Sequence, residues 1–396
     1  MQKLFPDCTF EIINFDTKGD QILNIALPKI GDKGLFTKEL EDGLENGSID
    51  FVVHSLKDMP CQTMPEKLIL CGIPVREDPR DALVMAKRHE KTKFSLDDLD
   101  DYSVIGTSSL RRISQLKLKY PKLKFETIRG NLQTRFAKLD DEANKFDAII
   151  LAAAGLNRLD YQHRITQYLS SEICMHAVSQ GALGIQSRRD DLEMIKMINN
   201  LNDEATLLRC IAERTFLAAL EGGCSAPVGV FSKLTENSIF LEGAVFDLEG
   251  TVKIADKFEI SFDSSATLES YNCPILPTLD DAQKAVLKID NKLLTDEDKA
   301  KLSESKSSDI NKRHHSASDE DETKNINESL LKKIKSAASK EPFTLKYYSF
   351  IADLNISENK LIKAELCGLH LAQKLKEKGA DVLINECKAI IGNKMN

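Results

Sequence analysis

Tryptophan is absent from the 396-residue sequence, and aromatic residues make up only 6% of it. Hydrophobic residues make up 42%, which is enough for real cores, and these cores must be mainly aliphatic. No run of about eighteen apolar residues occurs, so we expect no membrane span. The length is sufficient for two or three domains.

Signals of secretion and of metal binding are also missing. The first residues lack the basic, apolar and small-residue regions of a secretory signal. The nine cysteines are scattered and include no Cys-x-x-Cys, which is typical of free thiols in a reducing cytosol, so we expect a cytoplasmic protein. The seven histidines show no ligand spacing, so no metal site is expected. A net charge of −8 argues against a general nucleic-acid binder.

The distribution of arginine is the informative feature of the composition. Eleven of the fourteen arginines lie between Arg76 and Arg189, whereas the lysines are spread along the chain. The planar guanidinium group binds carboxylates and phosphates with two parallel hydrogen bonds. Two interpretations remain open at this level: a local anion-binding surface, or a chance cluster of solvated arginines.

Short apolar runs alternate with helical spacing over residues 10–200, which predicts α/β units. The continuous apolar run at residues 148–151 suits a sheet covered on both faces. The expected strands are Phe10–Phe15, Asp50–Ser55, Lys67–Pro74, Asp81–Met85, Ser103–Thr107 and Asp147–Ala154, and the expected helices are Phe36–Gly47, Ser108–Tyr120 and Leu132–Ala143.

The pattern of apolar and polar residues changes after residue 200. A helix over Asp203–Leu220 is followed by alternating runs at 228–234, 238–246 and 252–262, which predict antiparallel strands in a separate α+β domain. Residues 295–340 are polar and lack aromatic side chains, so we expect them to be disordered. Beyond them we expect a helix over Leu361–Lys376 and a strand over Asp381–Ile384.

Asp58 directly follows a strand of the buried type, in His54–Pro60. Open α/β sheets bind ligands at the carboxyl ends of their strands, so Asp58 could act on a substrate proton or cation. Taken alone, a capping role for Asp58 in the following turn is the simpler interpretation.

The segment Gly106–Arg112 combines a strand end with a helix start. Its hydroxyls and free backbone N–H groups, from Thr107, Ser108 and Ser109, can bind an anion. Arg111 and Arg112 oppose the helix dipole there, and an anionic ligand would resolve this conflict.

Further arginines follow the next predicted strands. Arg129 and Arg135 lie on either side of Gly130 and the start of a helix, and Arg158 follows a strand and a glycine. Basic groups at several strand ends indicate a ligand with several carboxylates or phosphates. Neither a Walker A sequence nor G-x-G-x-x-G occurs, so a nucleotide is not indicated.

Cys224 lies in the Gly-rich stretch Gly222–Pro227 after a helix. Glycines leave space around the sulfur, so the thiol could serve as a covalent attachment point. A small buried cysteine with a purely structural role is an equally good interpretation of this motif alone.

Together these motifs resemble the porphobilinogen deaminase (hydroxymethylbilane synthase) family. The matching stretches are KIGDKGLFTKELE, DFVVHSLKDMP, VIGTSSLRRISQL, IRGNLQTR, LAAAGLNRL, AVSQGALGI and ERTFLAALEGGCSAPVG. They occur in the family's order over about residues 8–250, with a weaker match over 343–390.

The resemblance implies an α/β protein of three domains. Two α/β lobes like those of periplasmic binding proteins would span 1–78 with 179–200 (domain 1) and 79–178 (domain 2). A smaller α+β domain over 201–396 would carry the cofactor cysteine. The family is monomeric, acts on the small molecule porphobilinogen, and has no nucleic-acid or membrane partner.

The resemblance also implies the chemistry. A dipyrromethane cofactor is held through a thioether to Cys224, four porphobilinogen units are joined head to tail with loss of ammonia, and water releases hydroxymethylbilane. Asp58, with Lys57 beside it, is the catalytic carboxylate. The implied cofactor-binding residues are Lys33, Thr107, Ser108, Ser109, Arg111, Arg112, Arg129, Gly130, Gln180 and Gly181, and the implied substrate-binding residues are Lys29, Phe36, Ser55, Arg135 and Arg158.

The sequence departs from the family at its start. Family members begin with a strand and a helix bearing Arg-Lys-Ser-x-Leu-Ala, whereas this sequence reads directly into the second strand, so we expect an exposed sheet edge. Two alternatives to the enzyme therefore remain: a non-catalytic shortened isoform, and an anion-binding or interaction protein on the same scaffold.

Overall fold

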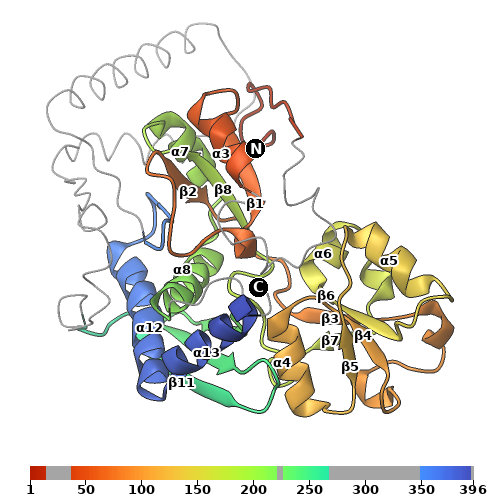
Figure 1. Ribbon diagram of the computed structural model, residues 1–396. Coiled ribbons are helices and arrows are strands. Elements are labelled where there is room, and N and C mark those ends of the chain that lie inside the picture. Colours follow the sequence, from red (N-terminus) through yellow and green to blue (C-terminus); the bar gives the residue numbers. More distant parts are fainter. Residues whose placement is uncertain (15–36, 221–225, 267–347, 394–396) are drawn as a thin grey trace, which may run out of the picture. The chain divides into compact units, whose positions relative to one another are not determined.

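The computed structural model describes residues 1–14, 37–220, 226–266 and 348–393. In these ranges the strands form three sheets, and helices alternate with the strands along the chain (Figure 1). The mixed α/β class predicted from the alternating sequence pattern is confirmed. No helix in these ranges is long and apolar enough to cross a membrane.

The first sheet joins strands from distant parts of the chain. Its order is β1 (Phe51–Ser55), β8 (Leu183–Arg188) and β2 (Leu68–Gly72), and both pairings are antiparallel. In the sequence, the central strand β8 comes after all five strands of the second sheet. Helices α3 (Lys38–Glu45) and α7 (Leu192–Asn199) accompany this sheet, and the short 3₁₀ helix η1 (Leu56–Asp58) follows β1 directly.

The second sheet has five strands in the order β5 (Lys124–Glu126), β4 (Val104–Gly106), β6 (Ala148–Ala152), β3 (Asp81–Met85) and β7 (Gln167–Leu169). The strands β5, β4 and β6 are parallel, whereas β3 is antiparallel to both of its neighbours. Helices α4 (Leu110–Lys119), α5 (Leu132–Asp140) and α6 (Ala153–Arg158) surround this sheet in Figure 1. The 3₁₀ helices η2 (Lys87–His89), η3 (Leu96–Asp98) and η4 (Gln162–Arg164) lie in its connections.

Both faces of the second sheet are covered, as the apolar strand pattern predicted. Leu83 and Ile150 belong to one buried cluster, and their chain neighbours Val84 and Ile149 belong to another. Successive side chains of a strand point to opposite faces, so each strand contributes to two cores. This arrangement leaves the strand ends as the places where polar side chains can gather.

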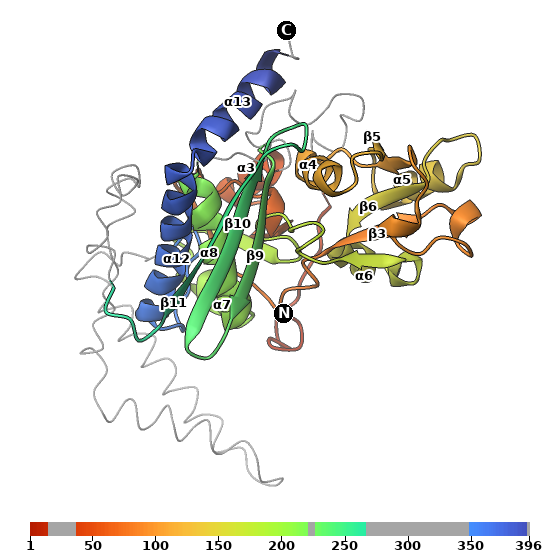
Figure 2. The ribbon, with the colours of Figure 1, turned by 90° about the horizontal axis from the view of Figure 1, so that it is seen from below.

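The third sheet is an antiparallel meander of β9 (Val228–Leu234), β10 (Ser238–Phe246) and β11 (Lys253–Ser261). Helices α8 (Glu204–Ala219), α12 (Glu358–Glu377) and α13 (Ala380–Asn393) belong to this region, with α12 beside β11 (Figure 2). Glycines allow close packing around α8. A Cβ atom at Gly368 would lie 2.4 Å from the Ala212 carbonyl oxygen, and one at Gly243 would lie 2.4 Å from the Phe216 ring.

Two strand predictions are wrong. Residues 10–14 are irregular and have no strand partner among the described residues, and Ile12 is 86% exposed, so the apolar run lacks the neighbour that a strand needs. Residues 381–384 belong to α13. Its buried side chains Ala380, Leu383, Ile384 and Cys387 follow helical spacing, while Val382 is exposed.

Other sequence-based predictions fall outside the described ranges. Cys224, Lys29, Lys33, Phe36 and the polar stretch 295–340 lie in residues that the structure does not describe. The remaining predicted helices and strands are confirmed to within a few residues. Strands β7 and β8 and helices α6 and α7 were not predicted, and the strand expected directly before Arg129 is β5.

Candidate active site

The turn that carries Lys57 and Asp58 is fixed by buried residues on both sides. Leu56 and Met59 are 0% and 1% exposed, and the Met59 N–H donates to the Leu56 carbonyl at 3.2 Å. The Leu56 N–H donates to the Ala182 carbonyl at 3.0 Å, at the start of β8. Between these anchors Asp58 is exposed to solvent and Lys57 is half-buried, so the core holds the turn while its polar residues remain accessible.

The pKa values of this pair are shifted towards each other. Desolvation raises the pKa of the Asp58 carboxyl, and the Lys57 ammonium opposes that rise. Desolvation also lowers the pKa of Lys57, and the charge of Asp58 opposes that fall. The Asp58 carboxyl therefore takes up a proton at a higher pH than an ordinary aspartate does, which suits a residue that transfers protons.

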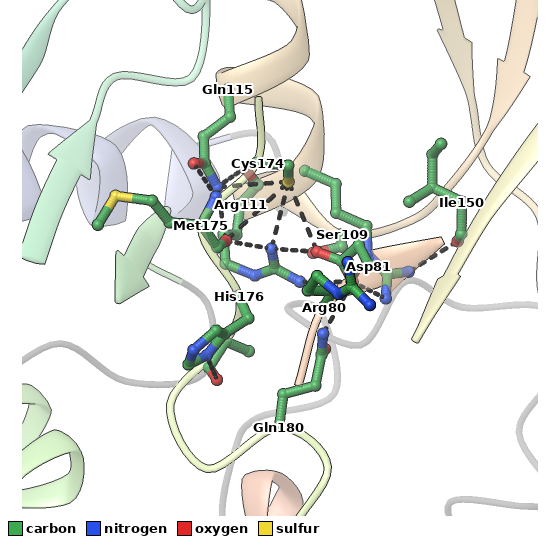
Figure 3. Close-up of polar contacts among 12 residues, drawn as sticks. Arg80, Asp81, Ser109, Arg111, Gln115, Ile150, Cys174, Met175, His176 and Gln180 are labelled. Carbon is green, nitrogen blue, oxygen red and sulfur yellow. Dashed lines mark hydrogen bonds and ion pairs between the residues drawn. The ribbon is translucent and has the colours of Figure 1, made fainter. Parts of the chain in front are cut away.

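Asp81, the first residue of β3, binds both arginines at the start of α4. Its Oδ2 accepts from Arg111 Nη1 at 2.6 Å, and its Oδ1 accepts from Arg112 Nη2 at 2.7 Å. All three side chains are buried, and Asp81 is 0% exposed. Figure 3 shows Asp81 between Arg111 and Gln180, whose amide donates to Oδ1 at 2.9 Å. The two guanidinium groups hold the pKa of Asp81 well below its usual range despite its burial.

This buried carboxylate resolves the conflict that the sequence posed. Arginines in the first turn of α4 oppose the helix dipole, and the sequence predicted an external anion to offset them. The structure supplies an internal anion, Asp81, which sequence reasoning missed. A charged residue opening a buried apolar strand was the available signal, because a buried carboxylate needs a cation. One carboxylate between two guanidinium groups leaves one positive charge in the cluster.

Gln115 extends the same network to the segment before β8. Its amide accepts from the Met175 N–H at 2.8 Å and donates to the Met175 carbonyl at 3.1 Å, and Arg111 donates to that carbonyl at 2.7 Å (Figure 3). Cys174 lies within the network, with its Sγ 3.5 Å from Asp81 Oδ2. Desolvation raises the pKa of this thiol to about 12, so Cys174 stays protonated and serves as a structural residue.

Arg129 and Arg135 differ from the first pair because no ion pair to a described carboxylate is found for either. Arg135 Nε donates to the Gly130 carbonyl at 2.8 Å, with Gly130 at a φ of 111°. Desolvation, with the charges of Arg112 and Arg129, lowers the pKa of Arg135 to about 10. Arg129 Nη1 is buried and has no hydrogen-bond partner within the described ranges. Two half-buried cations, one of which has a buried donor without a described partner, offer hydrogen bonds to an anion.

The predicted hydroxyl groups are placed unequally. Thr107 is buried, Ser109 is half-buried and Ser108 is exposed, with Ser108 Oγ donating to the Ile128 carbonyl at 2.9 Å. Ser109 is the N-cap residue of α4 but makes no side-chain capping bond. The helix start therefore keeps hydrogen-bonding capacity for a ligand.

Gln180 and Gly181 lie where the chain crosses back to the first sheet. Gly181 has a φ of 88°, and a Cβ atom there would lie 2.4 Å from the Glu77 carbonyl oxygen, so only glycine fits. Its carbonyl accepts from Arg158 Nη2 at 2.7 Å and from the Glu77 N–H at 3.1 Å. Arg158 is thus joined to the crossing segment, while Ser55 is exposed at the end of β1.

Electrostatic interactions connect these groups into one site. The charges of Asp81, Arg111 and Arg112 all act on Lys57, and Arg112 acts on Arg135. The site thus joins the η1 turn, the start of α4 and the start of α5, which are the strand ends chosen from the sequence. The described residues contain no group of three or more potential metal ligands.

Comparison with known proteins identifies the family of the chain. The model of the porphobilinogen deaminase dipyrromethane cofactor binding domain matches residues 1–196, and that of the porphobilinogen deaminase C-terminal domain matches residues 207–295. The chain belongs to the porphobilinogen deaminase family.

Individual relatives agree with this assignment. The porphobilinogen deaminase of Nostoc sp. is 51% identical over 65% of this chain and 78% of its own length, and that of Synechococcus elongatus is 50% identical over 65% and 79%. Among solved structures, the periplasmic VFT2 domain of Bordetella pertussis BvgS is 18% identical over 45% of this chain and 71% of that one. Its TM-score is 0.26, which is too low to define the fold.

Proposed function

We propose that the chain is a porphobilinogen deaminase (hydroxymethylbilane synthase), which joins four porphobilinogen molecules head to tail and releases ammonia and hydroxymethylbilane. The single observation that carries this proposal is that Arg111 and Arg112, which share one carboxylate, act by their charges on the turn that carries Lys57 and Asp58. Porphobilinogen carries an acetate and a propionate group, so each added unit brings two negative charges to these arginines. The assignment of the chain to the family supports the same reaction.

Asp58 is the proposed catalytic residue. Each condensation breaks a C–N bond to release ammonia, leaves a cationic pyrrole methylene on the substrate, forms a C–C bond and removes a ring proton. A carboxylate near the pyrrole N–H stabilises the cation, and its raised pKa suits it to take up and release the proton. Lys57 supplies the opposing charge that keeps this pKa from rising further.

The dipyrromethane cofactor fits the described residues. The buried, unpaired Arg129 Nη1 and the unneutralised Arg135 offer donors for its carboxylates. Our proposal assigns it the binding residues Lys33, Thr107, Ser108, Ser109, Arg111, Arg112, Arg129, Gly130, Gln180 and Gly181, and a thioether to Cys224. When bound, the cofactor supplies the pyrrole end that is extended. Lys29, Phe36, Ser55, Arg135 and Arg158 are assigned to the incoming substrate.

The proposed domains follow the three sheets. Domain 1 (1–78 and 179–200) and domain 2 (79–178) are assigned as periplasmic-binding-type lobes, and domain 3 is 201–396. Support comes from the chain order, because β8 joins β1 and β2 across the whole second sheet. We further propose a cytoplasmic monomer, in keeping with seven free cysteines in the described part of the chain.

The intact mass of the purified chain tests this proposal. A resting mass higher by one dipyrromethane, absent in Cys224→Ala, followed by stepwise increases on addition of porphobilinogen, is the expected result. A bare protein mass that does not change with substrate would reject the enzyme and favour the non-catalytic isoform. Binding of porphobilinogen that is unaltered in Cys224→Ala would favour the anion-binding alternative.

A further inference from the structure

Arg214 lies in the middle of α8 and is 0% exposed, yet its side chain reaches the turn that carries Asp58. Its Nη2 donates to the Pro60 carbonyl at 2.6 Å and its Nη1 to the Met59 carbonyl at 3.2 Å. Its Nε lies 3.4 Å from the Ser349 carbonyl. One guanidinium group thus binds two successive carbonyls directly after Asp58.

These bonds complete the fixation of the catalytic turn. The N-terminal side of η1 is held by the Leu56 N–H donating to the Ala182 carbonyl at 3.0 Å. On the C-terminal side, Met59 is the C-cap residue of η1, and Arg214 donates to its carbonyl. Asp58 lies between the two attachment points and is itself exposed, so its position depends on the backbone on either side.

The acceptors of Arg214 are unusual for a buried cation. The adjacent carboxylate of Glu213 binds Arg76 at 2.7 Å and also accepts from the Ser179 N–H and Ser232 Oγ, so it is committed elsewhere. Arg214 therefore relies, within the described ranges, on backbone carbonyls. Burying a charge is costly unless its donors are satisfied, and that cost is hard to explain by packing alone.

The shape of the guanidinium group explains why arginine stands at this position. Its rigid, planar fork binds two carbonyls at once and thereby fixes the plane of the peptide between them. A lysine ammonium is a single point and would leave one carbonyl without its donor. The fork therefore controls the direction of the backbone that leaves Asp58.

We propose that Arg214 is a positioning residue for Asp58. It acts from α8, whose last residue, Ala219, lies five positions before Cys224 in the sequence. The helix α8 thus carries the residue that holds the turn of Asp58, and in the sequence it directly precedes the segment with Cys224. This inference rests on the proposed function of Asp58 and extends it, because Arg214 need not touch the substrate.

The first test compares Arg214→Lys with Arg188→Lys. Arg188 also donates to two backbone carbonyls, of Leu44 and Ile49, but these do not adjoin Asp58. Displacing a catalytic group by a fraction of an ångström is expected to lower kcat of Arg214→Lys at least about 10-fold. Its KM for porphobilinogen should change less than about 3-fold, because the arginines at the starts of α4 and α5 are untouched. The control should keep kcat within about 2-fold.

The pH profile of kcat is a second readout, since a moved Asp58 sits in a different environment of desolvation and Lys57 charge. We expect the acidic limb of the profile to shift in Arg214→Lys and not in Arg188→Lys. Wild-type kcat and an unshifted profile in a folded Arg214→Lys variant would overturn the proposal.

Hydrogen exchange covers the case in which Arg214→Lys does not fold. Arg214→Gln removes the buried charge and retains one donor group, and we expect faster exchange of the backbone amides of residues 56–62 than in Arg188→Gln. Unchanged exchange there would overturn the proposal. This readout does not depend on turnover. An inactive wild-type chain would therefore reject the proposed function without deciding whether Arg214 fixes the turn.

Discussion

The two arginine pairs of the site have opposite surroundings. Arg111 and Arg112 share the buried carboxylate of Asp81, whereas Arg129 and Arg135 have no carboxylate partner in the described ranges. The first pair binds a carboxylate of the protein itself, keeps one net positive charge, and fixes the start of α4 against β3. The second pair has no such partner among the described residues, and desolvation, with the charges of Arg112 and Arg129, lowers the pKa of Arg135 to about 10. Arginines that look equivalent in the sequence thus divide into a closed group and an open one.

The closed group should dominate stability. Asp81→Asn leaves two buried guanidinium groups with insufficient negative charge, so we expect a loss of about 3–5 kcal/mol in the free energy of unfolding. Asp140→Asn is the matched control, because Asp140 accepts two bonds of 2.9 Å from Arg164 but is 16% exposed. Urea denaturation of both variants measures the difference. Equal losses would mean that Asp81 is an ordinary ion-pair partner.

Acid should weaken the network next to this closed group. Burial lowers the pKa of His176 from 6.5 to about 4. Between these pH values the unfolded chain is protonated at His176 and the folded chain is not. Stability from this residue is complete above pH 6.5 and falls as the pH drops towards 4, by up to about 3 kcal/mol. Urea denaturation at pH 7, 5.5 and 4.5 should therefore show a weaker pH dependence in His176→Gln. Parallel curves for variant and wild type would refute this.

The open group should have little effect on folding. Replacing Arg129 with Met removes the buried Nη1 that has no described partner, so we expect the free energy of unfolding to change by less than about 1 kcal/mol. The fraction of the purified chain that carries the dipyrromethane cofactor should fall about 10-fold, because a charge-assisted hydrogen bond to a cofactor carboxylate is lost. Denaturation and intact mass on one preparation provide the measurement. A large loss of stability with an unchanged cofactor content would place Arg129 in the closed group.

Local patterns predicted much of the fold. Strand β3 covers Asp81–Met85 as predicted, because a continuous apolar run follows Asp81. The run at 382–384 misled because three apolar residues fit a strand or a helix, and only the burial of Cys387 one turn later reveals the helix. The residues 10–14 fit a strand in isolation, but a strand exists only with a partner.

The site was predictable in its residue types and not in its pairings. Asp58 and the arginines stood out because they follow strands that the sequence predicts. Asp81 did not, because its partners are 30 and 31 positions away and only the folded sheet joins them. For the same reason no local signal showed that Arg214 would reach the carbonyls after Asp58, more than 150 positions earlier.

The measurement that tests the division of arginines most directly is made on Arg135→Leu. Its thermal unfolding and its intact mass should be recorded with and without porphobilinogen. We expect a Tm equal to or above that of the wild type, because a desolvated cation without a carboxylate partner is removed. We also expect loss of the stepwise mass increases at substrate concentrations that saturate the wild type. A lowered Tm with an intact series of mass increases would show that Arg135 supports the fold and not the growing chain, and would contradict the division of the arginines into closed and open groups.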